Sequence, residues 1–142
     1  VPEARFTVVG SNPPPEIKAL EKDPSIKVTG FVEDLRPYAE AAAVFVVPLR
    51  IGSGMRVKIL DAMALGLPIV TTSVGCEGIS LLPGKHALVA DSPGQFAESV
   101  VSLLRNPKIR VEIGSAGRSF VESNYAWKPI LQRLDAVLAR FE

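Results

Sequence analysis

The fold of this chain is decided by the stretch PLRIGSGMRVKILDAMA, which runs from Pro48 to Ala64. It follows an apolar run, Val44–Val47, with hydrophobic side chains on both faces, as in strands of a parallel sheet that helices cover on each side. A glycine-bearing loop comes next and leads into a helix, expected from about Met55 to Leu65. A further apolar run, Ile69–Thr71, predicts the next strand. The order strand, helix, strand predicts a parallel α/β unit.

The same alternation extends to both sides of this stretch. We expect further strands at Phe6–Val9, Ile26–Thr29 and Ala87–Ala90. Helices are expected over Glu16–Lys22, from a cap at Asp34 through Ala42, from a cap at Ser92 up to Asn106, over Lys108–Ser123 and over Lys128–Phe141. This pattern predicts a Rossmann-like parallel sheet with helices on both faces, which binds ligands at the carboxyl ends of its strands.

The composition fits one globular domain over residues 1–142. Hydrophobic residues make up 47% and charged residues 22%, which provides a buried core and argues against disorder. A net charge of +1 argues against a dedicated nucleic-acid binder. The longest apolar run, Ala41–Leu49, is too short to span a bilayer. With one cysteine, Cys76, and one histidine, His86, the chain has no internal disulfide or structural zinc site, and a reducing, cytoplasmic setting is expected.

The loop and helix start after Pro48 have the features of an anion site. A helix start exposes unpaired backbone amides, and glycines let an anion approach them closely. Arg56 and Lys58 lie in or near the first turn, where the helix dipole disfavours cations by about 0.3–1 kcal/mol each. Together with Arg50 they favour a bound diphosphate. The alternative is a solvated pair of Lys58 with Asp61, three residues apart, worth roughly 0.2–0.5 kcal/mol.

Other chemistries fit the sequence less well. The segment Gly52–Gly54 supplies two glycines of the dinucleotide fingerprint, but Val57 stands at the third position and no acidic residue follows the strand at Thr71. The phosphate-binding pattern GxxxxGK[ST] does not occur. His86 is expected to be a solvated loop residue, which nearly excludes a serine–histidine–acid triad. Cys76 is expected to be a small packing side chain and not a nucleophile.

The segment from Gly54 to Thr72, GMRVKILDAMALGLPIVTT, closely resembles the core signature of retaining GT-B glycosyltransferases of the glycosyltransferase group 1 type. The segment Val28–Asp34 resembles the strand and turn that this family uses around the nucleobase. The loop GCEG at Gly75–Gly78 resembles the one after the family's signature helix. Because the resemblance covers nearly the whole chain, it implies the nucleotide-sugar-binding, C-terminal domain of a two-domain enzyme.

The resemblance also implies which residues contact the donor. In the family, the acidic residue at the position of Asp61 bonds the ribose hydroxyls, and the backbone near Val32 holds the base. Aspartate replaces the usual glutamate there, and Ser53 replaces a glutamate that touches the transferred sugar, so no catalytic residue is assigned. The full expected donor site comprises Val32, Ser53, Gly54, Met55, Arg56, Lys58 and Asp61. No metal or cofactor is implied, because cations and helix amides can stabilise a leaving diphosphate.

Several parts of the family's enzyme are expected to lie outside this chain. The chain begins at Val1 without an initiator methionine, and the acceptor-binding domain and a basic pair would lie upstream. The first strand of the domain is also expected to be missing from between Phe6–Val9 and Val44–Val47. An empty slot would leave two rows of backbone groups unpaired. Three outcomes could relieve this: the two strands pair with each other, a second copy inserts a strand, or the sheet splits with helices shifting inward. We favour the first two, because buried unpaired backbone groups are costly.

The expected parent enzyme transfers a sugar from a nucleoside diphosphate sugar to a glycan or lipid acceptor, with retention. The isolated chain is expected to be inactive, and peripheral membrane association is considered for the parent only. Two alternatives remain: a nucleotide-sugar epimerase of the same architecture, and a non-catalytic nucleotide-binding module, which the loss of the usual glutamate at Ser53 leaves open.

Overall fold

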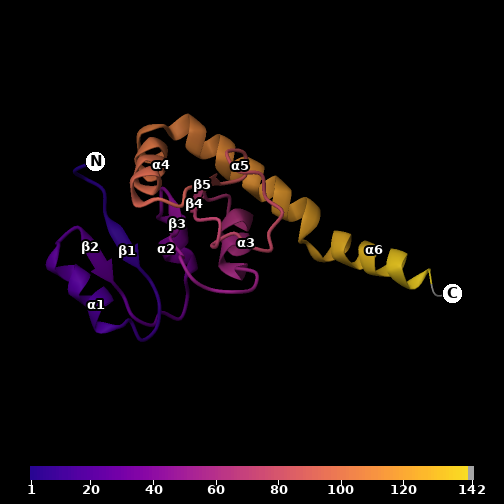
Figure 1. The fold of residues 1–142 in the computed structure, drawn as a ribbon, viewed down its shortest axis with the longest axis horizontal. Helices are drawn as coiled ribbons and strands as arrows, with labels where there is room; N and C mark the ends of the chain where they lie inside the picture. The colour runs from indigo at the N-terminus through magenta and orange to yellow at the C-terminus, as the bar shows by residue number, and fades with distance from the viewer. Residues whose placement is uncertain (141–142) are drawn as a thin grey trace. The chain divides into compact units, whose positions relative to one another are not determined.

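The computed structural model describes residues 1–140, which form two compact units, Val1–Ala41 and the residues from Ala42 onward. Each unit has a parallel sheet of its own, as Figure 1 shows. The α/β class and the parallel strands expected from the sequence are therefore confirmed. Phe141, at which the last helix was expected to end, lies outside the described residues.

In the first unit, strand β1 (Phe6–Val8) pairs in parallel with β2 (Ile26–Val28). The connection between them contains helix α1 (Pro15–Lys18) and the 3₁₀ turn η1 (Ala19–Lys22). The single helix expected over Glu16–Lys22 is thus split. The Pro13-Pro14-Pro15 run before it fixes its start, with Pro15 in the first turn, where the missing N–H is not needed.

Helix α2 (Arg36–Glu40) is shorter than expected. Asp34 Oδ1 accepts the backbone N–H of Arg36 at 2.9 Å, and its carboxylate pairs with the Arg36 guanidinium at 2.8 Å. These bonds from Arg36 lower the pKa of the Asp34 carboxyl below its usual range. Asp34 therefore does act at the helix start, but from two residues before the first helical residue.

In the second unit, strands β3 (Phe45–Val47), β4 (Ile69–Thr71) and β5 (Leu88–Val89) lie in the order β3-β4-β5, all parallel. All three β4 residues are fully buried, at 0% exposure. Because successive side chains of a strand point to opposite faces, both faces of this sheet must be covered. The helices α3 (Val57–Ala64) and α4 (Pro93–Arg105) both pack against β4, which confirms the expected layers.

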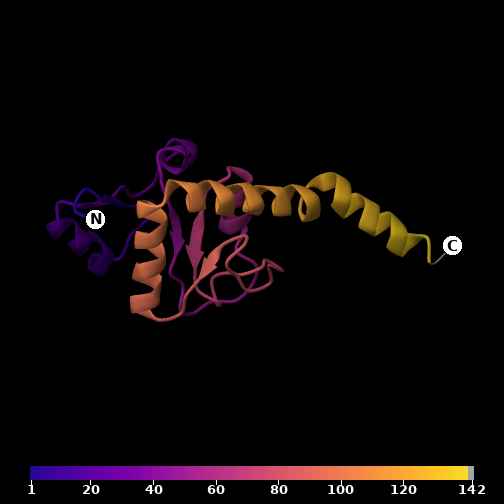
Figure 2. The same cartoon turned by 90° about the horizontal axis from the view of Figure 1, so that it is seen from above.

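The C-terminal helices follow the expected boundaries closely. Ser92 caps α4 by accepting the Gln95 N–H at 3.3 Å, and Asn106 ends α4 and caps α5 (Pro107–Asn124). Helix α6 (Trp127–Leu138) continues from the end of α5 and contains no buried residue. Both Figure 1 and Figure 2 show α6 extending away from the sheet of its own unit. Within residues 1–140, no helix combines the length and the apolar composition that crossing a bilayer requires.

The expected direct pairing of the first and third strands is wrong. β1 and β3 belong to separate sheets and are not hydrogen-bonded to each other. The three residues of β1 are exposed or half-buried, with Phe6 at 41% exposure. Water can therefore reach the backbone groups on the edge of β1, which removes the penalty that pairing was expected to avoid.

Two glycines let α5 approach the signature helix closely. A Cβ at Gly114 would collide with the carbonyl oxygen of Gly66, in the turn that ends α3. A Cβ at Gly117 would lie 3.4 Å from Met63 Cγ and 3.1 Å from the carbonyl oxygen of His86. Backbone carbonyls cannot be displaced as a side-chain tip can, so α5 fixes the position of α3 in this unit.

We predict that Gly114→Ala lowers the free energy of unfolding by about 1–3 kcal/mol, because it overpacks this contact. Gly94→Ala is the matched control, since Gly94 also lies in a helix but nothing lies within 4 Å of its added Cβ. The control should be neutral or slightly stabilising, as alanine is the better helix former. Chemical denaturation of both variants tests this, and equal stabilities would contradict the close approach at Gly66.

Candidate functional site

Two buried threonines fasten the start of the loop between β3 and α3. The hydroxyl of Thr71 donates to the carbonyl oxygen of Val47 at 3.3 Å, and the hydroxyl of Thr72 donates to that of Leu49. The Thr72 hydroxyl in turn accepts the backbone N–H of Gly75 at 2.9 Å. The first residues after β3 are thus held by the residues at the end of β4. From the sequence, we expected these threonines only to end the strand. Two adjacent hydroxyls at the carboxyl end of a buried strand could have indicated that they bond a neighbouring loop.

The loop after β4 lies against both threonines and against the loop before α3. A Cβ at Gly75 would collide with the Thr71 hydroxyl, and one at Gly78 would lie 3.7 Å from Met55 Cα. Gly78 also has a φ of +78°, a conformation that favours glycine. The Gly75–Gly78 loop, which the sequence linked to the signature only by resemblance, therefore packs directly on it.

Arg56 fastens the other end of the loop. Its Nη1 donates to the carbonyl oxygen of Ser53 at 2.6 Å, and its guanidinium lies where a Cβ at Gly52 would be. Helix α3 begins at Val57 and not at Met55, because Gly54 has a φ of +79° and Arg56 has a ψ of 86°. The glycine conformation delays the helix by two residues relative to the expected start.

Six of the expected donor residues lie in the loop before α3 or on α3 itself. Ser53, Gly54 and Met55 are exposed in the loop, and Arg56 is half-buried at the helix start. Lys58 and Asp61 lie on the exposed side of α3, opposite the buried Ile59, Ala62 and Met63.

Lys58 and Asp61 do not form the helix ion pair considered as an alternative. Within residues 1–140 no ion pair involves either side chain. Those that form join Arg36 with Asp34, Lys108 with Glu112, and Arg118 with Glu122. No acidic residue occupies the first turn of α3, and no side chain caps it. The first amides of this helix, beside Arg56 and Lys58, therefore have no side-chain cap that would compete with an anion.

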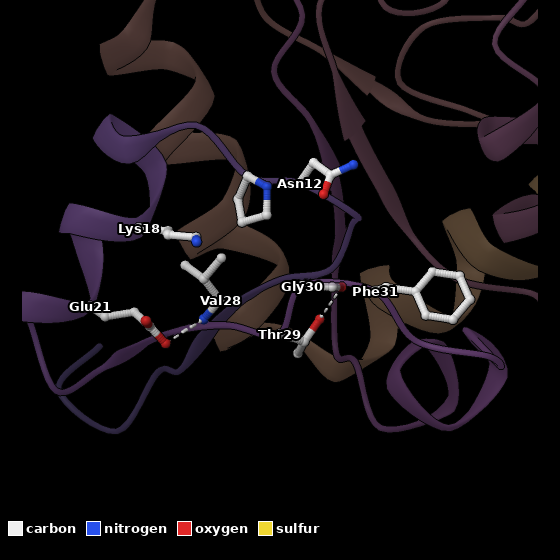
Figure 3. A pocket seen from close by; sticks show the side chains of 8 residues that line it. Asn12, Lys18, Glu21, Val28, Thr29, Gly30 and Phe31 are labelled. Carbon is white, nitrogen blue, oxygen red and sulfur yellow. Dashed lines mark hydrogen bonds between the residues drawn. The ribbon is translucent and has the colours of Figure 1, made fainter.

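Val32, the remaining expected residue, belongs to the first unit and is half-buried just after β2. Beside it is a hollow of about 480 Å³ at the carboxyl ends of β1 and β2. Figure 3 shows Glu21 accepting the Val28 N–H, at 3.0 Å, on one side of this hollow, and the Phe31 ring pointing away on the other. The hollow is lined by Asn12, Pro13, Lys18, Glu21, Val28, Thr29, Gly30 and Phe31.

A second hollow, of about 230 Å³, lies at the carboxyl ends of β3, β4 and β5. Pro48 and Thr72 line it, and so does Asp91, whose Oδ1 accepts both the N–H and the hydroxyl of Ser73 at 2.8 and 2.9 Å. Of the expected cations only Arg50 lines this hollow. The residues from Gly52 to Asp61 line neither hollow.

His86 is buried, at 8% exposure, so the expectation of a solvated loop residue is wrong. Its Nδ1 accepts the backbone N–H of Leu82 at 3.1 Å, and its ring stacks on Phe120 with centroids 4.5 Å apart. Burial, assisted by the charge of Lys85, lowers the pKa of His86 below its ordinary value of 6.5. The side chain is a neutral structural residue that joins the β5 region to α5.

Cys76 is half-buried, and burial raises the pKa of its thiol, which disfavours the thiolate that a nucleophile requires. In the part of the chain from residue 1 to 140, no three histidine, cysteine or acidic side chains gather as a metal site would need.

Comparison with known proteins adds to this geometry. The family model described as "Glycosyl transferases group 1" matches residues 1–106. The chain is 30% identical over 149 aligned positions to the GDP-mannose-dependent monoacylated alpha-(1-6)-phosphatidylinositol monomannoside mannosyltransferase of Corynebacterium glutamicum, covering 96% of this chain and 39% of that protein. The chain spans about a quarter to two-fifths of the length of such curated relatives.

Solved structures show the same architecture. Anabaena HepE in complex with UDP superimposes with a TM-score of 0.84 at 16% identity, over 99% of this chain and 42% of that one. Sucrose-phosphate synthase from Thermosynechococcus elongatus gives a TM-score of 0.81 at 22% identity, over 99% and 39%. At these identities the likeness establishes the fold, which is the expected GT-B type.

The burial of His86 predicts a pH dependence of stability. Because its pKa is lower in the folded chain than in the unfolded chain, the unfolded chain binds the proton more readily. The free energy of unfolding should therefore be highest above the ordinary pKa of 6.5, and should fall as the pH drops below it until the folded-state pKa is passed. Denaturation of the wild type and of His86→Gln between pH 5 and pH 8, roughly the range in which histidine titrates, tests this. An equal slope in the variant would contradict it.

Proposed function

Because the chain belongs to the group 1 glycosyl transferase family, we propose that residues 1–142 are the nucleotide-sugar-binding domain of a retaining glycosyltransferase. The parent enzyme transfers a sugar from a nucleoside diphosphate sugar to a glycan or lipid acceptor. The observation that carries this proposal is the start of α3, where Arg56 and Lys58 lie without an acidic side chain in the first turn. This arrangement is unfavourable with the helix dipole alone and favourable with a diphosphate bound.

The other expected donor contacts are assigned within each unit separately. Asp61 lies on the exposed side of α3 and offers a carboxylate to the ribose hydroxyls. Ser53, Gly54 and Met55 present the loop before the helix, where exposed backbone lets a phosphate approach. The base is assigned to the backbone near Val32, beside a hollow whose wall includes Phe31, an aromatic side chain at 75% exposure.

Two relatives support the donor class. The corynebacterial relative is named as dependent on GDP-mannose, and the HepE structure is a complex with UDP. Both ligands carry a nucleoside diphosphate, which is the group that the cations at α3 would recognise. The corynebacterial name also describes a phosphatidylinositol acceptor, which agrees with a lipid acceptor and with peripheral membrane association of the parent. A cytoplasmic location belongs to the same proposal.

In this mechanism the domain binds and polarises the donor. Cations and helix amides can stabilise the charge that develops on the leaving diphosphate, so the proposal does not require a metal. Ser53 cannot supply the carboxylate that the family usually places there, and no residue of this chain is assigned as catalytic. The same serine supports the alternative of a non-catalytic nucleotide-binding module.

We predict that Lys58→Ala weakens nucleoside diphosphate binding by about tenfold, the loss expected when a hydrogen bond to a charged group is removed. The free energy of unfolding should change by less than about 0.5 kcal/mol, as at ordinary surface sites. Lys108→Ala is the matched control, because Lys108 is an exposed helical lysine far along the chain, in α5. Titration calorimetry with GDP, UDP and ADP is the measurement. A variant that melts lower and binds normally would assign Lys58 to folding.

We also predict that the isolated chain binds a nucleoside diphosphate but transfers no sugar, since it lacks the proposed acceptor domain. The longer parent enzyme, incubated with a panel of nucleotide sugars, should form a glycosylated acceptor. Formation of an epimer instead would support the epimerase alternative, and binding without turnover would support the non-catalytic module. Transfer by the 142-residue chain alone would contradict the proposal.

A further inference from the structure

Arg50, Arg56 and Lys58 lie in the loop before α3 and in its first turn, but they differ in their surroundings. Arg50 and Lys58 are exposed, whereas Arg56 is half-buried although it lies at the end of a surface loop. Its Nη1 donates to the Ser53 carbonyl oxygen at 2.6 Å, and its Nε is buried without a hydrogen-bond partner among the described residues. A side chain this long usually keeps its charged end in water, so its return onto its own loop requires a reason.

We propose that Arg56 is a positioning residue that holds the Gly52–Gly54 loop in shape from inside, while Arg50 and Lys58 supply the direct contacts to the diphosphate. This inference rests on the proposed function, in which this loop and the start of α3 receive the donor. The guanidinium fills the space above Gly52 and bonds the Ser53 carbonyl. It therefore links the loop to the residue from which α3 begins.

The Arg56 guanidinium can take this position because residue 52 is a glycine. A Cβ there would collide with the Arg56 guanidinium, and the Gly52 φ of +150° also disfavours other residues. Gly54 differs, because it has a φ of +79° but nothing lies within 4 Å of an added Cβ. The two glycines of the loop thus have separate roles: Gly54 allows the turn, and Gly52 makes room for the guanidinium.

The bond to Ser53 also changes the electrostatics of the loop. A carbonyl oxygen carries partial negative charge and would repel a phosphate that approaches the helix start. Donation from a guanidinium engages this oxygen in a charge-assisted bond and offsets that charge. The Thr72 hydroxyl engages the Leu49 carbonyl oxygen at the start of the same loop. Donors thus hold carbonyl groups at both ends of the loop, which leaves the backbone between them for the donor.

The test is a pair of double-mutant cycles on the 142-residue chain, combining Arg56→Ala with Gly52→Ala and with Gly54→Ala. Arg56→Ala and Gly52→Ala should each speed hydrogen exchange of the loop amides and weaken GDP or UDP binding by about tenfold, the loss expected for a hydrogen bond from a charged group. Their double variant should lose less than the sum of the two single losses, because the collision with the guanidinium is gone and only the backbone cost of Gly52→Ala remains. The Gly54→Ala and Arg56→Ala effects should instead add.

Chemical rescue separates this role from simple loss of stability or of charge. Guanidinium chloride at low millimolar concentration should restore binding and slow loop exchange in Arg56→Ala but not in Lys58→Ala, because only the first variant vacates a guanidinium-shaped space. Additive effects of Gly52→Ala and Arg56→Ala, or unchanged loop exchange in Arg56→Ala, would overturn the inference. If the wild type binds no nucleoside diphosphate at all, the proposed function fails, while the exchange measurements still decide whether Arg56 orders the loop.

Discussion

Beyond the last residue of a parallel strand the hydrogen-bond ladder ends, and the backbone groups there need other partners. In this chain two threonine hydroxyls at the end of β4 supply them, to the carbonyl oxygens of Val47 and Leu49. These bonds cross between neighbouring strands, so the loop after β3 leaves the sheet in a direction set by β4. The same hydroxyl of Thr72 accepts from Gly75 and thereby places the loop after β4. This arrangement places the start of the loop before α3, and the close approach of α5 places α3 itself.

The site is consequently a surface held at its edges. Thr72 holds the loop where it begins, Arg56 holds it where α3 begins, and Gly78 lies beside Met55 between them. Between them, Ile51 is 90% exposed. Fixed ends with an exposed centre suit the proposed binding of a donor, since amides and cations are oriented before the ligand arrives and little order must be gained on binding.

The sequence predicted the elements that depend on local chemistry. The strand at Ile69–Thr71 is found at its expected residues, and Ser92 and Asn106 act as the expected caps. The misjudged features depend on contacts between residues far apart in the chain. His86 is buried because Phe120, on α5, provides a ring to stack on, and no pattern near position 86 records that. The start of α3 was misplaced for a different reason: the backbone of Gly54 and the return of Arg56 onto Ser53 are not visible as periodicity.

The sequence predicted that Arg50, Arg56 and Lys58 are cations near a helix start, but it did not predict that their roles differ. Spacing alone treats Arg50, Arg56 and Lys58 as equivalent charges near a helix start. The structure separates them by what each side chain contacts, because a guanidinium that bonds a loop carbonyl has fewer donors left for a ligand than an exposed ammonium. Ser53 adds to this distinction: its carbonyl oxygen accepts from Arg56, while its short hydroxyl stands where a carboxylate is usual. In the proposed enzyme, this domain therefore orients the diphosphate, and the groups that act on the sugar must come from elsewhere in the assembled active site.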